Sequence, residues 1–258
     1  MTTTSITLAE TPLLALVLRR ADDALILGHR LSEWCGHGPM LEEDVALANI
    51  ALDCVGQARS LYDYAATLDG RGLTEDDLAY RRDVGQYRNC LLVEQPNGDF
   101  AATIVRQVLA SAFLDPYWRA MTASADPTLA AIAAKAEKET AYHLRHAAEW
   151  LIRLGDGTPE SHERAQAALD DLWPYSGELM ESDDAEAELV RAGIAVDPAA
   201  IRPAFDATVA MVLREATLTA PAASWRQSGG RQGRHSEHLG FILADLQYLQ
   251  RAHPGATW

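Results

Sequence analysis

Apolar residues recur along most of the chain at the three- and four-residue spacing that is typical of helices. A capping residue followed by proline begins four of these runs, where a proline at the first helical position loses no hydrogen bond. The four pairs are Thr11-Pro12, Asp126-Pro127, Thr158-Pro159 and Asp197-Pro198. Gly36, Gly70 and Gly155 each follow a periodic run, so we expect each to end a helix in the left-handed conformation.

These signals predict an all-α protein. The expected helices lie at about 12–34, 41–68, 98–122, 127–154, 159–180, 198–217 and 236–251, with shorter turns near 75–93 and 183–192. No stretch alternates apolar and polar residues between turns, so we expect no strands. Long helices with short loops favour an antiparallel four-helix bundle at about 12–154. A C-terminal helical extension at about 159–258 completes a single expected domain over residues 1–258.

The charge of the chain narrows the range of partners. The formal net charge is −15 and the sequence pI is about 4.9, whereas nucleic-acid and anionic-membrane partners need a basic surface.

The three cysteines are odd in number and show no C-x-x-C spacing, as is usual for reduced cytosolic thiols. The apolar run at 13–18 is too short to span a bilayer and fits neither a signal peptide nor an anchor. We therefore expect a cytoplasmic protein.

Two predicted helices each carry one polar stripe. The stripes are Asn49, Asp53 and Gln57 on one helix, and Lys135, Glu139 and His143 on the other, each with four-residue spacing. If the two stripes face each other, Lys135 could neutralise Asp53 or Glu139 where a related bundle would hold a metal. The alternative is that both stripes are solvated faces with ordinary i,i+4 pairs.

The same helices lack the ligand pattern of a di-iron bundle. Such a bundle takes Glu from two helices and Glu-x-x-His from the other two. Neither Glu-x-x-His nor Asp-x-x-His occurs in the chain, and Tyr142 stands three residues after Glu139 where the histidine would be needed. The segment 100–114 of the third long helix has no carboxylate. We therefore predict no catalytic residue and no metal ligand, with the stripes as a vestigial polar cluster.

A glycine-rich basic segment precedes the last predicted helix. It reads SWRQSGGRQGRHSEHLG (224–240) and carries Arg226, Arg231 and Arg234. Three interpretations stay open: a turn-forming loop in which Ser236 caps the helix, a flexible contact loop for an acidic partner, or a site for a phosphate of CoA.

Several long stretches carry a family resemblance. They are LGHRLSEWCGHGP (27–39), LANIALDCVGQARSLY (47–62), RNCLLVEQPNGDFAATIVRQ (88–107), YHLRHAAEWLIRLGDGT (142–158), LWPYSGEL (172–179) and HSEHLGFILADLQYLQRAHPG (235–255). The chain resembles, nearly from end to end, the C subunits of the bacterial phenylacetyl-CoA epoxidases. Val84-Gly85, Cys90 and Ala147 are local departures from the family pattern.

The resemblance implies a ferritin-like fold and a non-catalytic role in a complex that acts in aerobic phenylacetate degradation. It also implies that the di-iron centre lies in a homologous catalytic A subunit, that a separate reductase carries flavin and iron-sulfur groups, and that this chain holds no cofactor. Two alternatives are a self-sufficient ferritin-like metal-dependent oxygenase and a free-standing helical binding protein. Iron analysis separates the first alternative from the implied role, and size with and without the A subunit separates the second.

Overall fold

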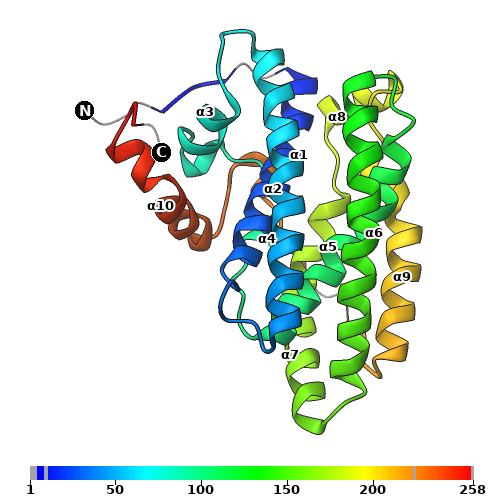
Figure 1. Ribbon diagram of the computed structural model, residues 1–258. Helices are drawn as coiled ribbons and strands as arrows, with labels where there is room; N and C mark the ends of the chain where they lie inside the picture. The colour runs from blue at the N-terminus through cyan, green and yellow to red at the C-terminus, as the bar shows by residue number, and fades with distance from the viewer. Residues whose placement is uncertain (1–4, 9–10, 223–224, 257–258) are drawn as a thin grey trace.

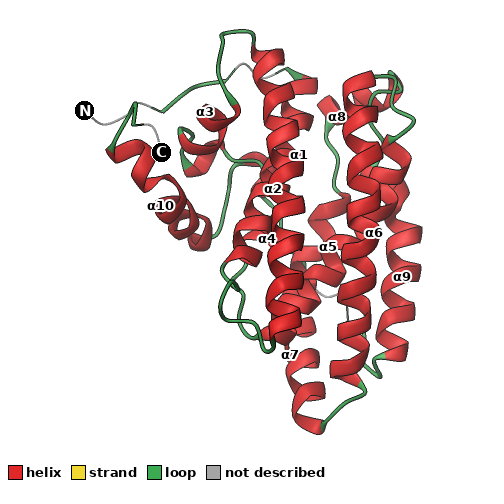
Figure 2. Cartoon of the chain, viewed as in Figure 1, coloured by secondary structure: helices red, strands yellow, loops and turns green. Residues whose placement is uncertain are grey.

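The computed structural model describes residues 5–8, 11–222 and 225–256, and these residues form helices and no strands (Figures 1 and 2). The all-α prediction is confirmed. The α-helices are α1 Pro12–Ser32, α2 Leu41–Asp69, α3 Glu75–Tyr80, α4 Leu91–Glu94, α5 Phe100–Met121, α6 Pro127–Gly155, α7 Pro159–Ser176, α8 Asp184–Arg191, α9 Arg202–Glu215 and α10 Glu237–Ala252. Short 3-10 helices are η1 Val84–Gln86, η2 Gly177–Met180, η3 Pro198–Ile201 and η4 Gly230–Gln232.

Four long helices, α1, α2, α5 and α6, form the bundle, with α1 packed on α2 and α5 packed on α6 (Figure 1). Helices α1 and α5 are buried on nearly every face. The other elements pack around these two helices and cover the faces that the bundle partners leave open. Helices α7 and α9 cover α5, α4 and α8 contact α1, and α10 packs beside α3 at the edge of the bundle (Figure 2).

The predicted helix starts are confirmed by their caps. Asp126 accepts hydrogen bonds from the backbone N–H groups of Thr128 and Leu129, both at 2.9 Å, and Thr11, Thr158 and Asp197 cap in the same way. Two predicted helices are shorter than expected. The helix from Pro159 ends at Ser176 and continues as η2, and the segment from Pro198 begins as η3 before α9.

Of the three predicted glycine stops, Gly70 is the left-handed cap of its helix, whereas α1 is capped by Glu33 and α6 by Asp156. Gly70 does end α2 with a φ of 72°, and Gly36 has a φ of 82° in the turn after α1. Gly155 is the last helical residue of α6, and a Cβ there would lie 2.1 Å from the carbonyl oxygen of Ala216. Glycine is needed at this position because the chain after α9 approaches α6 closely.

Candidate functional site

The two predicted polar stripes meet between α2 and α6. Gln57 Nε2 donates to Glu139 Oε2 at 2.8 Å, and His143 Nε2 lies 3.0 Å from Asp53 Oδ2. A third pair, which the sequence did not indicate, joins His146 Nε2 to Glu43 Oε2 at 2.8 Å. We call these three pairs the α2–α6 seam. The first of the two sequence hypotheses is therefore right in that the stripes face each other.

The seam lies at the boundary between the protein interior and the solvent. The His143 side chain is 3% exposed, whereas that of its partner Asp53 is 37% exposed. Burial lowers the pKa of His143 below its ordinary value, although the hydrogen bond and the charge of Asp53 oppose this shift. The imidazole of His143 is therefore neutral at neutral pH, and Asp53 is hydrated on its outer side.

Lys135 and Asn49, the two other members of the predicted stripes, lie at the outer side of the seam. The Lys135 side chain is 65% exposed, and its Nζ lies 3.4 Å from Glu139 Oε1 on the same helix. Asn49 is exposed on α2. Of the two pairings that the sequence allowed for Lys135, the structure has the one with Glu139, whereas Asp53 pairs with His143. Because the lysine itself is largely exposed, it does not replace a metal inside the bundle.

The side chains of the seam do not fit a di-iron centre. They come from α2 and α6 only, and Asp53, Gln57, Glu139 and His143 already bond one another. Between Asp99 and Asp115, the bundle helix α5 carries buried Thr103, Gln107 and Ser111 but no carboxylate. Among the described residues, no three His, Cys, Asp or Glu side chains are grouped so that they could hold a metal ion. The donor set is thus short of the carboxylates that two iron ions need.

A second polar region, which sequence reasoning missed, lies deeper in the protein. Asp23 on α1 accepts from Arg231 Nη1 at 2.9 Å and Nη2 at 2.8 Å, and from the backbone N–H of Cys90 at 2.8 Å. Its neighbour Asp22 bonds both Arg82 Nη groups and the Tyr62 hydroxyl. The Asp22, Asp23, Arg82 and Arg231 side chains are at most 6% exposed.

Two glutamates hold the loop that precedes α10 against this region. Glu178 accepts from the backbone N–H groups of Gly229 at 2.9 Å and Arg231 at 3.2 Å. Glu94 Oε2 lies 2.8 Å from His235 Nδ1, and Glu94 Oε1 accepts from the Ser236 N–H at 2.6 Å. Together, seven residues form what we call the buried ionic network: Asp22, Asp23, Arg82, Glu94, Glu178, Arg231 and His235.

These contacts correct the interpretation of the basic segment. Arg231 lies inside the protein and pairs with Asp23, so it is not a surface contact residue. The loop at 229–236 is fixed by several hydrogen bonds rather than flexible, and the Ser236 side chain makes no capping bond. Arg226 and Arg234 are exposed, so they alone of the three remain candidates for partner contact.

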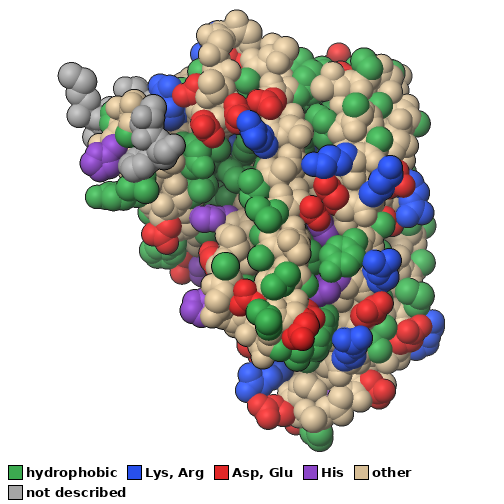
Figure 3. All heavy atoms as spheres, viewed as in Figure 1, with side chains coloured by type: hydrophobic (Ala, Val, Ile, Leu, Met, Phe, Trp, Pro, Cys, Tyr) green, Lys and Arg blue, Asp and Glu red, His purple; other side chains and the backbone are tan. Residues whose placement is uncertain are grey.

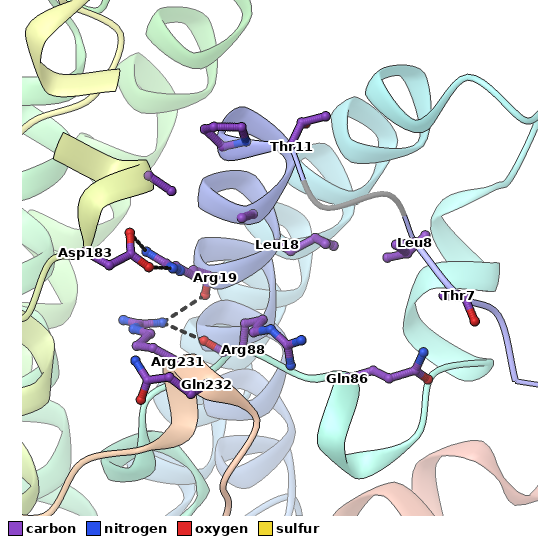
Figure 4. Close-up of a pocket in the computed structure, with 13 residues that line it drawn as sticks. Thr7, Leu8, Thr11, Leu18, Arg19, Gln86, Arg88, Asp183, Arg231 and Gln232 are labelled. Atoms are coloured by element: carbon purple, nitrogen blue, oxygen red, sulfur yellow. Dashed lines mark hydrogen bonds and ion pairs between the residues drawn. The ribbon is translucent and has the colours of Figure 1, made fainter. Parts of the chain in front are cut away.

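A cavity of about 490 Å³ opens beside the network, between the start of α1, the loop near η1 and the start of α8. Figure 4 shows Arg19 pointing toward Asp183 across one wall, while Arg231 donates to the backbone carbonyls of Arg19 and Arg88. The cations of Arg19 and Arg231 are matched by carboxylates of this chain. The cavity therefore offers no unmatched positive charge from these two side chains to an anionic ligand.

One sequence signal could have revealed the network. The segment RRADD (19–23) places four charges in the middle of an otherwise apolar helix. Because consecutive helical positions point in different directions, at least some of these charges must enter the interior, where each needs a partner from elsewhere. The identity of those partners cannot be read from local spacing.

The four-helix architecture and the seam define a ferritin-like bundle whose facing polar groups pair with each other. The chain belongs to the family described as "Phenylacetic acid catabolic protein", whose model matches residues 1–258. It is similar to the C subunit of the 1,2-phenylacetyl-CoA epoxidase of Escherichia coli (strain K12), with 50% identity over 246 residues that cover 95% of this chain and 99% of the relative.

No helix among the residues that the structure describes is both long enough and apolar enough to cross a membrane.

Proposed function

We propose that this chain is a structural, non-catalytic subunit of a phenylacetyl-CoA 1,2-epoxidase in aerobic phenylacetate degradation, where it pairs with the di-iron catalytic A subunit. The observation that carries the proposal is the similarity to the C subunit of such an epoxidase over 95% of the chain. The α2–α6 seam supports the non-catalytic part, because its acids and imidazoles are occupied with each other.

In this proposal the redox groups belong to other subunits. The di-iron centre that activates dioxygen lies in the A subunit, and a separate reductase holds flavin and iron-sulfur groups. This chain holds a fixed helical surface against the A subunit and stabilises its active conformation. Permanent complexes of this kind commonly bury more than about 2,000 Å², so we expect the two subunits to purify together.

Reconstitution with the A subunit tests the proposal. The A subunit alone should be inactive or unstable, and adding this chain should restore epoxidation. His143→Ala should leave the turnover of the mixed complex nearly intact after correction for stability, because the imidazole is hydrogen-bonded to Asp53 of the same chain. A loss of several orders of magnitude in rate from a complex that assembles normally would contradict the non-catalytic role.

Iron analysis separates this proposal from a self-sufficient oxygenase. After anaerobic reconstitution with ferrous iron, the purified chain should hold no stoichiometric iron. Two irons per chain with an oxo-bridged absorption band would instead favour the oxygenase.

The domain organisation and the cellular location of the chain are also part of this proposal. Packing of α7 and α9 on α5 supports one domain over residues 1–258. A cytoplasmic location is supported by Cys35, Cys54 and Cys90, which are free thiols.

A further inference from the structure

The outer face of α2 differs from an ordinary solvated helix face. Five positions spaced by four and three residues form what we call the α2 stripe: Leu41, Val45, Ala48, Leu52 and Val55. Leu41 is 77% exposed and Leu52 is 68% exposed. Figure 3 shows hydrophobic side chains gathered along this part of α2, whereas charged groups dominate the neighbouring face of α6.

The spacing of the α2 stripe indicates what could cover it. Apolar residues repeating at four and three residues keep one seam facing a second helix, as in coiled coils and helical bundles. The interior of the bundle already has its own buried positions on α2, such as Leu47, Ile50 and Cys54. The stripe is therefore a second apolar face, and the described residues leave its leucines largely uncovered.

After Val55, the exposed side chains on this side of α2 are charged instead of apolar. The next exposed positions are Arg59 and Asp63, and Asp63 lies beside Glu75 and Asp76 of α3. Partial burial and these neighbouring carboxylates raise the pKa of Asp63 above its ordinary value. Arg59 bonds Glu75 at 3.3 Å, yet three carboxylates face this one cation. We call Asp63, Glu75 and Asp76 the acidic end of the stripe.

We propose that a helix of the partner subunit packs on the α2 stripe, and that this partner helix brings basic side chains to the acidic end. The inference rests on the proposed function for the existence of that partner. The area of a single stripe falls short of a permanent interface, so the stripe forms the apolar centre of a larger contact whose charged rim sets the orientation.

The charges argue against a second copy of this chain as the occupant. Two copies in parallel would place their acidic ends side by side. Two antiparallel copies would bring each acidic end toward the first turn of the other α2, where Glu42 is exposed. The net charge of −15 adds to this repulsion. A different subunit with an apolar stripe and a basic rim avoids both conflicts.

The test compares Leu52→Asp with Met211→Asp. Met211 lies on α9 and is 45% exposed, so it is a matched apolar surface position away from the stripe. The full-length chains are titrated against the A subunit by sedimentation velocity, and their melting curves are recorded. Leu52→Asp should weaken association by at least about 30-fold, the scale of a central interface residue, while Met211→Asp should bind as the parent does.

A second arm tests the acidic end. Asp63→Lys combined with Asp76→Lys should slow association and flatten its dependence on salt concentration, because rim charges act mainly on the rate of encounter. Unchanged association rates at low salt would overturn the basic-rim part of the proposal.

Each remaining outcome is informative. If the parent chain binds the A subunit and Leu52→Asp binds equally well, the partner helix does not pack on the α2 stripe. If the parent chain does not bind the A subunit at all, the proposed function fails first. If the parent chain dimerises by itself and Leu52→Asp abolishes only that dimer, the occupant is a second copy and the proposal is wrong.

Discussion

The α2–α6 seam and the buried ionic network are both polar, but they differ in how far water reaches their side chains. The seam joins two neighbouring helices by pairs such as Asp53 with His143, in which one partner stays hydrated. The network joins α1 to a loop near the other end of the chain through Asp23 and Arg231, which lie 208 residues apart and are both buried. A partly hydrated pair can lose one member and recover with water, whereas a dry pair cannot.

The largest expected effect comes from breaking the network. Arg231→Met leaves the carboxylate of Asp23 buried without its main cation, so it should lower the free energy of unfolding by about 3–5 kcal/mol. Arg234→Met is the matched control, because Arg234 lies three residues away in the same loop and is exposed. The control should change stability by less than about 0.5 kcal/mol. Urea denaturation of both variants measures the difference, and equal midpoints would show that the network is dispensable.

The next prediction uses pH to separate the two regions through their histidines. Burial alone would lower the pKa of His235, but the hydrogen bond and the charge of Glu94 raise it above its ordinary value. The pKa of His143 is instead lowered by burial. The unfolded value is about 6.5 for both. The contribution of His235 is therefore full below about pH 6.5 and is lost as pH rises through its folded pKa.

His143 has the opposite sign. Because its folded pKa lies below the unfolded value, the unfolded chain binds the proton more readily, and stability is lost as pH falls below about 6.5. Unfolding free energies are measured between about pH 5 and 9 for the parent, His235→Gln and His143→Gln. The advantage of the parent over His235→Gln should shrink toward high pH, and its advantage over His143→Gln should shrink toward low pH. Two curves that run parallel to the parent would contradict both assignments.

The seam and the network also differ in what the sequence could predict, because some contacts depend on neighbouring residues and others on distant segments. Helix starts such as Asp126-Pro127 depend on groups within three residues, and four-residue spacing was enough to place Asp53 and His143 on stripes that meet. The burial of Arg231 depends on Asp23, and the need for glycine at 155 depends on Ala216. Such requirements arise only when distant segments pack, so local patterns indicated an exposed contact residue and a helix cap instead.

The smallest expected effect comes from Lys135, which pairs with Glu139 but is exposed instead of buried. Had Lys135 been buried against Asp53 or Glu139, removing its charge would have left a carboxylate unpaired at a cost of about 3 kcal/mol or more. Instead Lys135 is 65% exposed, and Glu139 keeps a hydrogen bond from Gln57. Lys135→Met should therefore change the free energy of unfolding by no more than about 0.5 kcal/mol, the usual range for an exposed i,i+4 pair. Thermal melts at low and high salt measure this, and the small difference between variant and parent should vanish at high salt. A variant that melts many degrees lower would mean that the lysine lies inside the bundle in solution and that the seam is as dry as the network.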